Sequence, residues 1–350
     1  MFIIYKIMCG FFFEFSNKII NKNKSQIINL KNCLHRRGPD NFSYIKEKNF
    51  IVAFSRLSVQ DINKRSNQPF TDKEKRYFLI FNGELYNFLD LKKELKYQGI
   101  KFNTKSDTEV LFKLLKFKGL KYTLKVIRGM FSFIFIDKKK NIFYGARDHF
   151  GQKPLYYCKL KNNFQATTNI RSILDNVDNK LKKIDHESVS QYIFSSGIIS
   201  QPKTFFKNIS ALPAGTYFEF KNNKLKLKKY FNVYDLIDKN KYFIYKNKNR
   251  SEILDILDQK INNAVKKHIV SDARLGVTSS GGIDSSLILH YTSKLSKNLE
   301  IFTNKSYGIE KLSSNVTKIV KHNNINKNKI CFINQYKKEY FKNLCSLTEY

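Results

Sequence analysis

The stretch Met8-Cys9-Gly10-Phe11-Phe12-Phe13 (MCGFFF) places a cysteine between an internal methionine and a run of aromatic residues. Removal of everything before Cys9 gives one residue that carries both a thiol and a free α-amine. A deprotonated thiol is a strong nucleophile, and an α-amine with a pKa of roughly 7.7–8.0 accepts a proton near neutral pH. The position of this cysteine therefore decides whether the first half of the chain is built around a nucleophile at its own first residue.

The composition indicates a folded protein with two domains. A chain of 350 residues is long enough for two separate cores. Hydrophobic residues at 42% and aromatic residues at 15% argue against disorder. The formal net charge of +35 comes from lysines scattered along the whole chain, and such residues usually form solvated faces. We therefore expect no nucleic-acid partner.

The five cysteines are widely spaced and form no CxxC pair and no cluster with histidine. This spacing favours neither a zinc site nor a disulfide framework. An odd number of cysteines without a secretory signal is typical of a reducing compartment, so we expect a cytoplasmic protein. No apolar run approaches the roughly 18 residues that a membrane helix needs, so we expect no membrane partner.

Short strands separated by turns dominate the first two hundred residues. The strands are expected at 10–15, 50–58, 77–81, 131–136 and 155–160, and helical spacing appears at 87–98 and 108–117. This mixture predicts an α+β domain built on antiparallel sheets. Further along, helical spacing at 253–269 is followed by a strand at 275–278, a Gly/Ser loop and a helix at 284–295. That order is typical of a parallel α/β domain. We expect the first domain at 9–215, a linker at 216–250 and the second domain at 251–350.

The loop between that strand and that helix has the composition of a phosphate-binding site. It contains Ser279, Ser280, Gly281, Gly282, Asp284, Ser285 and Ser286. Glycines let the backbone approach an anion, the first N–H groups of the helix bind it, and serine hydroxyls add donors. Asp284 is suited to hold a Mg²⁺ ion that bridges phosphates. The alternative is a Gly-Gly turn followed by an Asp or Ser helix cap.

The segment 271–288 (SDARLGVTSSGGIDSSLI) resembles the pyrophosphate loop of glutamine-dependent asparagine synthetases. Seven motifs of the first domain are similar, in the same order, to those of class II glutamine amidotransferases, whose nucleophile is an N-terminal cysteine. They are MCG (8–10), RGPD (37–40), RLSVQD (56–61), FNGELYN (81–87), SDTEV (106–110), GMFSFIFID (129–137) and ARDHFGQKPLYY (146–157). The resemblance implies an N-terminal-nucleophile sandwich, with two antiparallel sheets between helix layers. It also implies that the second domain is the start of an adenine-nucleotide α-hydrolase-like parallel sheet.

The resemblance also implies roles for individual residues. Cys9 is the nucleophile, and the Asn82 side chain and the Gly83 N–H form the oxyanion hole. Arg56 binds the glutamine carboxylate, and Asp107 binds its amino group with Glu84 close by. The implied glutamine-binding residues are Arg56, Leu57, Ser58, Val59, Gln60, Asn82, Gly83, Glu84 and Asp107. ATP with Mg²⁺ binds the Ser279–Ser286 loop, and no tightly bound cofactor is implied. The implied reaction converts ATP, aspartate, glutamine and water into AMP, pyrophosphate, asparagine and glutamate.

Several of these residues also have simpler structural interpretations. Asn82-Gly83 between apolar runs is a strong signal for a tight hairpin turn. Asp107 is suited to cap the helix that follows it, and Cys9 is suited to be a small core residue in a strand. The preserved order of the motifs favours the catalytic interpretation.

The sequence departs from the family pattern in several places. Eight residues precede Cys9. Three alternatives follow: translation starts at Met8, the extension is cut off after translation, or this half is inactive. Thr278 and Ser279 replace the usual apolar pair before the loop, and the expected acidic pair is absent near 312–315. The second acidic motif of the family is absent before Tyr350, so we expect a truncated or split member.

These departures leave alternatives open for the activity and the partners. The acceptor is aspartate or another carboxylate, such as a sugar acid used in surface-polysaccharide synthesis. A further alternative is that the chain is a non-catalytic remnant that binds glutamine. A homodimer and a companion chain that supplies the missing synthetase portion are both compatible with the sequence.

Overall fold

The computed structural model describes residues 8–296, 298–304, 310–326 and 330–333. The chain divides into two compact units, with the boundary after Leu236. The first unit contains two six-stranded antiparallel sheets, and the second contains a three-stranded parallel sheet. This confirms the predicted fold class of both domains.

The first sheet of the first unit includes the strand that follows Cys9. In spatial order it contains β10 (Ser210–Ala211), β8 (Tyr156–Lys159), β9 (Asn163–Thr167), β1 (Gly10–Ser16), β3 (Phe50–Arg56) and β2 (Asn41–Lys46). The central strand β1 pairs with β3 on one side and with β9 on the other. The aromatic run after Cys9 is therefore the centre of this sheet.

The second sheet includes the strand that carries Asn82 and Gly83. In spatial order it contains β12 (Lys224–Lys229), β11 (Thr216–Lys221), β7 (Ile142–Arg147), β6 (Gly129–Asp137), β5 (Tyr77–Leu85) and β4 (Phe70–Thr71). Phenylalanines of the two sheets pack together between them, including Phe13, Phe50, Phe143 and Phe164. This aromatic core joins the two sheets face to face.

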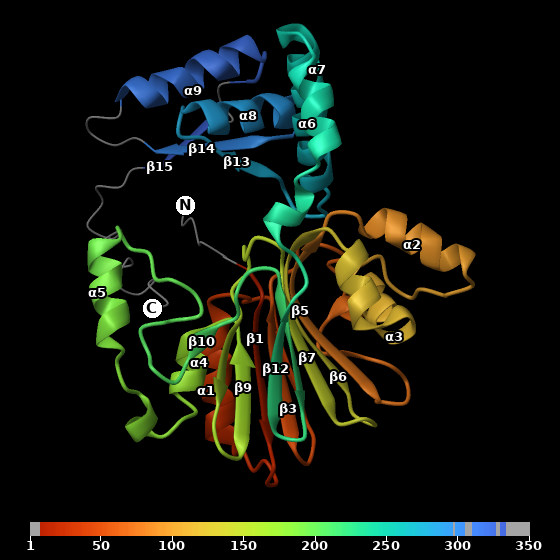
Figure 1. Cartoon of the computed structure of the whole chain (residues 1–350), viewed down its shortest axis with the longest axis vertical. Coiled ribbons are helices and arrows are strands. Elements are labelled where there is room, and N and C mark those ends of the chain that lie inside the picture. The colour runs from red at the N-terminus through yellow and green to blue at the C-terminus, as the bar shows by residue number, and fades with distance from the viewer. Residues whose placement is uncertain (1–7, 297, 305–309, 327–329, 334–350) are drawn as a thin grey trace. The chain divides into compact units, whose positions relative to one another are not determined.

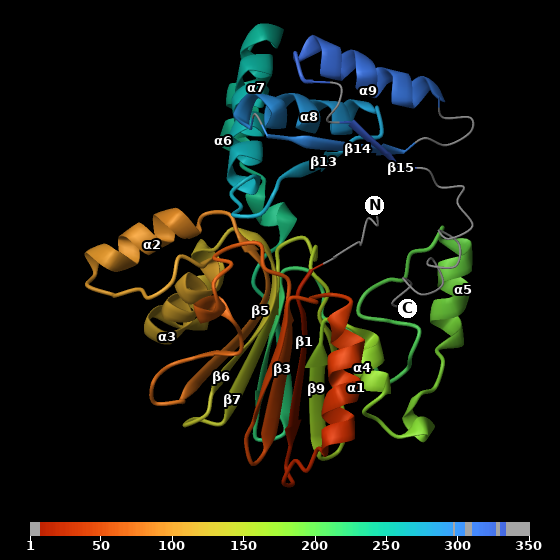
Figure 2. The same cartoon turned by 180° about the vertical axis from the view of Figure 1, so that it is seen from behind.

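Helices cover the outer faces of both sheets (Figures 1 and 2). On the first sheet, α1 (Lys24–His35) and α4 (Ile170–Leu174) bury apolar side chains against β1 and β3. On the second sheet, α2 (Phe88–Tyr97) and α3 (Asp107–Val126) pack on β5 and β6. The predicted helix at 108–117 is longer in the structure, because α3 continues past a kink at Gly119. The remaining elements are η1 (Lys64–Ser66), η2 (Asn179–Leu181), α5 (His186–Phe194) and η3 (Val233–Leu236).

The hairpin interpretation of Asn82-Gly83 is wrong. Both residues lie inside the nine-residue strand β5, where Asn82 pairs with Ser132 and Gly83 with Phe131 of β6. Glycine is required at position 83 by close packing, because an added Cβ would stand 2.2 Å from the Met130 carbonyl oxygen.

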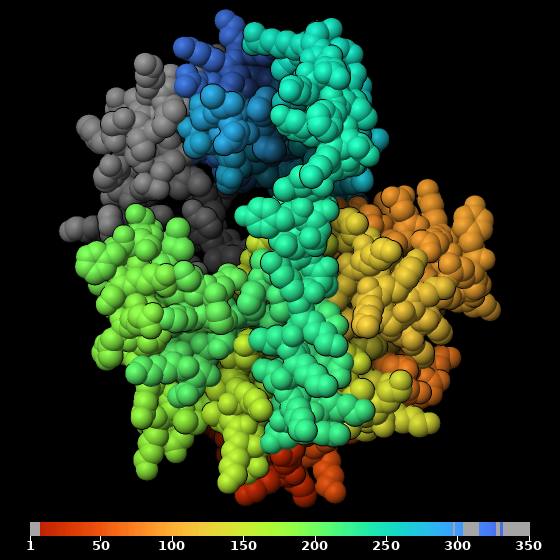
Figure 3. Space-filling view, in the orientation of Figure 1, coloured from red at the N-terminus to blue at the C-terminus, as the bar shows by residue number. Residues whose placement is uncertain are grey.

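The predicted linker at 216–250 begins too early in the sequence. Residues 216–229 form the hairpin of β11 and β12, which belongs to the second sheet through the pairing of β11 with β7. Figure 3 shows this hairpin at the surface of the first unit. The sequence KLKLKK of β12 is charged because β12 is an edge strand with mostly exposed side chains, and lysine on an edge discourages pairing with other chains.

The second unit has the predicted helix, strand, loop, helix order. It contains α6 (Lys239–Lys246), α7 (Arg250–His268), β13 (Gly276–Thr278), α8 (Ile283–Leu295), β14 (Glu300–Asn304), α9 (Glu310–His322) and β15 (Ile330–Ile333). Its sheet is parallel in the order β13, β14, β15. Across the described parts of both units, no helix combines the length and apolar content needed to cross a bilayer.

A buried ion pair on the central strand generates a first prediction. Glu14 and Lys22 lie 2.7 Å apart with both side chains only 8% exposed, and Asn163 also donates to Glu14. Lys22→Met leaves the Glu14 charge buried without its cation, so we expect a loss of about 3–5 kcal/mol in the free energy of unfolding at pH 7. Urea denaturation measures this loss. Lys18→Met, which removes an exposed lysine four residues earlier, is expected to change it by less than about 0.5 kcal/mol. Equal effects of the two substitutions would contradict the prediction.

Candidate active site

A cavity of about 310 Å³ lies in the first unit beside the beginning of β1. Every residue predicted for catalysis or glutamine binding lines it except Ser58, whose backbone N–H donates to Asp40 Oδ2 at 2.8 Å. The predicted lining residues are Cys9, Arg56, Leu57, Val59, Gln60, Asn82, Gly83, Glu84 and Asp107. The structure thus brings together residues that are up to 98 positions apart, from Cys9 to Asp107.

Cys9 stands immediately before β1, so it is not a core residue within the strand. The Leu57 N–H donates to its Sγ at 3.3 Å, and the thiol donates to the Leu57 carbonyl at 3.5 Å. Burial raises the pKa of the thiol to about 11, although Leu57, Arg56 and Lys153 act in the opposite direction. The thiol is therefore protonated at neutral pH, and it needs a proton acceptor before it can act as a nucleophile.

Asn82 supplies a buried hydrogen-bond donor to the same cavity. Alternation along β5 puts its side chain on the face that carries Phe78 and Ile80, which pack in the core between the sheets where Cys9 also packs. Asn82 is 1% exposed, and its Nδ2 has no hydrogen-bond partner within the described part of the chain. A buried donor without an acceptor is unfavourable, so an acceptor that enters the cavity is stabilised here.

The backbone of β5 presents a second donor at the edge of the strand. Alternate residues of a strand direct their N–H groups to the same edge. The N–H groups of Phe81 and Leu85 point away from β6. Gln68 Oε1 accepts from the Phe81 N–H at 2.6 Å, and Asp107 Oδ2 accepts from the Leu85 N–H at 3.0 Å. The N–H of Gly83, which lies between them, faces this edge beside the cavity that Gly83 lines.

Gln68 is a site residue that the sequence did not reveal. Its amide binds both backbone groups of Phe81, since Nε2 also donates to the Phe81 carbonyl at 3.1 Å. The side-chain amide of Gln68 thus makes the two backbone hydrogen bonds that a neighbouring strand would make to Phe81, the residue directly before Asn82. Gln68 is isolated in a segment without periodicity, so only the fold shows its contact.

Arg56 is buried, and its guanidinium is already engaged by the loop that follows it. Nη1 donates to the Asn63 carbonyl and to Asn67 Oδ1, and Nη2 donates to the carbonyls of Gln60 and Asp61, all at 2.6–3.1 Å. Each of these nitrogens has two hydrogens, so the fork predicted to bind a glutamine carboxylate is fully used. A carboxylate would have to displace two of these acceptors.

Asp107 is not the helix cap that one interpretation suggested. The cap of α3 is Ser106, whose side chain accepts from the Thr108 N–H. Asp107 is instead a buried carboxyl in the cavity wall, and it accepts from the Leu85 N–H. Burial, together with the nearby charge of Glu84, raises its pKa to about 7, although the hydrogen bond from the Leu85 N–H acts in the opposite direction.

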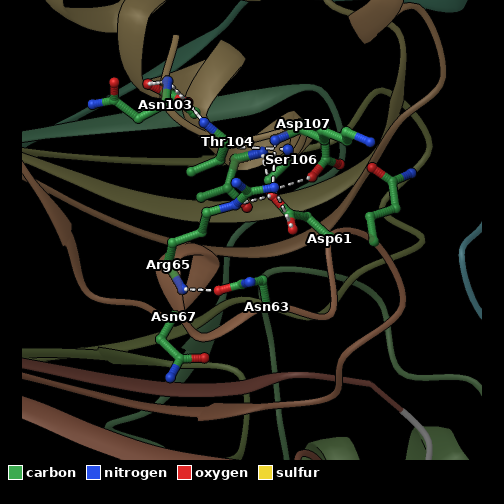
Figure 4. A network of polar contacts seen from close by, with 12 residues as sticks. Asp61, Asn63, Arg65, Asn67, Asn103, Thr104, Ser106 and Asp107 are labelled. Carbon is green, nitrogen blue, oxygen red and sulfur yellow. Dashed lines mark hydrogen bonds and ion pairs between the residues drawn. The ribbon is translucent and has the colours of Figure 1, made fainter.

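A polar network joins the loop after Arg56 to the segment before Asp107 (Figure 4). Asp61 Oδ2 accepts from the Lys105 N–H at 2.7 Å and is paired with Arg65. Glu109 Oε2 accepts from both the N–H and the hydroxyl of Thr104, at 2.7 and 2.8 Å. The Asp61–Lys105 bond joins the two segments, and the Glu109–Thr104 bonds hold the second segment against the start of α3.

Lys153 belongs to the motif ARDHFGQKPLYY, and its side chain enters the cavity although it is only 4% exposed. Asp148 orders this turn by accepting from four backbone N–H groups, those of Phe131, Phe150, Gln152 and Lys153. Arg147 orders it from the other side by donating to the carbonyls of Lys153, Leu212 and Gly151.

In the second unit, the loop predicted to bind phosphate joins β13 to α8. Gly281 has a φ of +80°, which favours glycine. Gly282 is the N-cap residue and no side chain caps the helix, so the alternative of an Asp or Ser cap is wrong. The Oγ of Ser279, which is 3% exposed, has no hydrogen-bond partner among the described residues. Unpaired donors at a helix N-terminus suit an anion.

Asp284 lies in the first turn of α8 and is exposed. No group of three or more metal-ligating side chains surrounds it or any other site in the described ranges. A single carboxylate suits Mg²⁺ that is held largely by phosphate oxygens, because this ion is often bound by one or two carboxylates together with substrate phosphates.

Comparison with known proteins agrees with this architecture. Residues 8–231 match the model of the glutamine amidotransferase domain family, and residues 257–329 match that of the asparagine synthase family. The chain therefore belongs to the glutamine amidotransferase domain family. Its more particular likeness, to glutamine-hydrolysing asparagine synthetases, confirms the resemblance predicted from the motifs.

Two curated relatives illustrate this likeness. Asparagine synthetase [glutamine-hydrolyzing] 1 of Bacillus subtilis is 30% identical over 300 residues, which cover 85% of this chain and 45% of the relative. Asparagine synthetase B of Escherichia coli is 29% identical over 294 residues, covering 82% and 45%. The chain spans about half the length of these relatives. A solved structure of glutamine phosphoribosylpyrophosphate amidotransferase from Bacillus subtilis aligns with a TM-score of 0.45 at 12% identity, covering 93% of this chain and 81% of that one.

The two bonds between Gln68 and Phe81 generate a second prediction. Gln68→Leu leaves both backbone groups of Phe81 buried without partners, so we expect a loss of about 1–3 kcal/mol in the free energy of unfolding. We also expect Asn82 to shift, which would lower kcat for the glutamine hydrolysis proposed below by about 10²-fold. Urea denaturation and an ammonia-release assay measure the two effects. Gln98→Leu, an exposed substitution at the end of α2, is the matched control. Wild-type kcat in Gln68→Leu would show that this amide does not position Asn82.

Proposed function

We propose that this chain hydrolyses glutamine to glutamate and ammonia at Cys9, and that the ammonia serves an ATP-dependent synthesis of asparagine from aspartate. One observation carries the first half of the proposal. The thiol of Cys9 and the unpaired amide donor of Asn82 line one cavity. A nucleophile and a donor for the developing oxyanion are the two groups that acyl transfer needs most.

The reaction begins with attack of the Cys9 sulfur on the side-chain amide carbon of glutamine. The thiol proton moves to the α-amine of Cys9, and the carbonyl oxygen becomes an oxyanion that accepts from Asn82 Nδ2 and the Gly83 N–H. The carbon–nitrogen bond then breaks, and the amine returns its proton to the departing ammonia. Water hydrolyses the resulting thioester through a second oxyanion at the same donors.

The proposal requires that the active chain begins at Cys9, because an amide-linked nitrogen is not a base. Met8 lines the cavity directly beside the nucleophile. Removal of Met8 and the residues before it gives Cys9 a free α-amine at the wall of the cavity.

The remaining charges of the cavity suit the two α-groups of glutamine. The carboxyls of Asp107 and Glu84 are placed to bind the α-ammonium group. Arg56 is the predicted partner of the α-carboxylate, and binding there requires the carboxylate to replace carbonyls of the 57–67 loop.

In the second unit, the Ser279–Ser286 loop is proposed to bind the phosphates of ATP with Mg²⁺ at Asp284. Ser280 and Ser285 stand 3.2 Å apart through their hydroxyls, and Ser286 donates to the Gly282 carbonyl at 2.6 Å. ATP would activate the side chain of aspartate as an acyl-adenylate with release of pyrophosphate, and ammonia would then displace AMP to give asparagine.

A third prediction tests the hydrolysis of glutamine. Cys9→Ala removes the nucleophile, so we expect no ammonia release from glutamine. Asn82→Ala removes one oxyanion donor and should lower kcat by about 10²–10³-fold with little change in fold. Asn87→Ala is not suitable as a control because Asn87 joins α2 to Val126 and Arg128. The exposed Asn21→Ala serves instead. Wild-type turnover in Cys9→Ala would refute the proposed function.

A fourth prediction concerns the pH dependence of glutamine binding. The Asp107 pKa of about 7 means that its carboxyl loses its charge as the pH falls below 7 in the free enzyme. The α-ammonium group of glutamine then loses an anionic partner, so KM should rise by up to about tenfold per pH unit below pH 7. Asp107→Asn should have a high KM that does not depend on pH between 6 and 8. A wild-type KM that stays constant over this range would contradict the assignment.

A further inference from the structure

The buried ammonium group of Lys153 is not used by the reaction sequence above. Lys153 lies in the wall of the Cys9 cavity, 4% exposed. Burying a cation is unfavourable unless charged or polar groups compensate it. Burial lowers the pKa of Lys153, and the charge of Glu84 acts in the opposite direction. The unfavourable burial of this ammonium group suggests a role other than packing.

The position of Lys153 is set by rigid backbone contacts. Its N–H donates to Asp148 Oδ2 at 2.9 Å, and its carbonyl accepts from Arg147 Nε at 2.7 Å. Both partners are themselves buried. The side chain therefore projects from a fixed turn into the cavity.

The ammonium group points toward the residue that precedes the nucleophile. Lys153 Nζ contacts the Met8 sulfur, and the Met8 N–H donates to the Arg37 carbonyl at 3.3 Å. Met8 is joined to the nitrogen of Cys9 by the peptide bond that must be cleaved to free the α-amine. The buried Lys153 therefore contacts the residue whose removal forms the α-amine of Cys9.

Other charged groups also face Cys9 and Lys153. Arg37 Nε donates to the Cys9 carbonyl at 3.3 Å, and Arg56 lies beside the thiol. The anions are Glu84, Asp107 and Asp148. Asp148 accepts from four backbone N–H groups, and Asp107 accepts from the Leu85 N–H. The cations around Cys9 are therefore Arg37, Arg56 and Lys153, and Glu84 is the anion with the largest effect on Lys153.

We propose that the Lys153 ammonium keeps the α-amine of Cys9 neutral at physiological pH, so that this amine accepts the thiol proton. A positive charge nearby disfavours the protonated amine, because two like charges repel in a poorly solvated cavity. The same charge favours loss of the thiol proton. The inference rests on the proposed hydrolysis of glutamine at Cys9, and Lys153 acts through the amine without touching the substrate carbon.

The dependence of kcat on pH tests the proposal in the full chain with Cys9 as its first residue, verified by mass. Saturating glutamine is used so that Asp107 is paired throughout the titration. Lys153→Met and Lys153→Gln should move the acidic limb of the kcat profile upward by about 1 pH unit or more. At pH 7 their kcat should fall severalfold, by up to about tenfold for a shift of 1 pH unit, and it should recover above pH 9. An exposed lysine of the same segment provides the control, and Lys159→Met should retain the wild-type limb.

A merely structural role predicts a different result, in which kcat falls at every pH and the acidic limb stays in place. That result overturns the proposal. Full activity in a chain that retains Met8 also overturns it, because the amine would then not be the base.

A direct titration keeps the test independent of turnover and of folding in the variants. The α-amine of ¹⁵N-cysteine-labelled protein is followed by NMR as the pH changes. The wild-type amine should titrate below the ordinary value of roughly 7.7–8.0, and the Lys153 variants should titrate higher. A wild-type value of about 8 or more overturns the proposal even if neither variant folds. Absence of glutamine hydrolysis by the wild type refutes the proposed function instead, and the titration still reports on Lys153.

Discussion

The buried guanidinium of Arg56 determines the shape of the candidate active site. It ends β3 and donates four hydrogen bonds to the loop that follows, three of them to backbone carbonyls. A buried charge is tolerated only when its donors are paired, so the loop and the charge depend on each other. The first residue of that loop, Leu57, both donates to and accepts from the Cys9 thiol. The environment of the Cys9 thiol therefore depends on the hydrogen bonds that the loop makes to Arg56.

The edge of β5 is the second constraint, and it acts on the opposite wall. Gln68 binds the backbone of Phe81, and Asp107 binds the backbone of Leu85. These two side chains hold the strand on either side of Gly83. The Asn82 side chain then extends from the face of the sheet while the Gly83 N–H extends from its edge. An oxygen that accepts from both donors has to lie where the face meets the edge, in the cavity that Cys9 also lines.

The sequence predicted most of the fold and the membership of the site, because the motifs occur in order and each contains the residues that line the cavity. Local patterns were misleading where a long-range contact decides the structure. Asn82-Gly83 has the composition of a turn, yet pairing with β6 keeps it in a strand. The prediction assigns the segment 216–229 to the linker because the motifs end before it, yet β11 pairs with β7. Gln68 and Lys153 were missed because their partners lie 13 and 145 residues away in the chain.

The electrostatics of the cavity make the reactivity of Cys9 conditional on its substrate. A thiol pKa of about 11 means that forming the free thiolate at pH 7 costs about 5 kcal/mol. In the proposed reaction, loss of the proton is therefore coupled to attack on a carbonyl group, when charge passes from sulfur to the oxygen that is proposed to accept from Asn82 and Gly83. One oxyanion donor typically contributes about 3–4 kcal/mol to such a transition state, so two donors are sufficient to offset the cost. In the empty cavity the sulfur stays a neutral thiol, which is far less prone to oxidation than a thiolate.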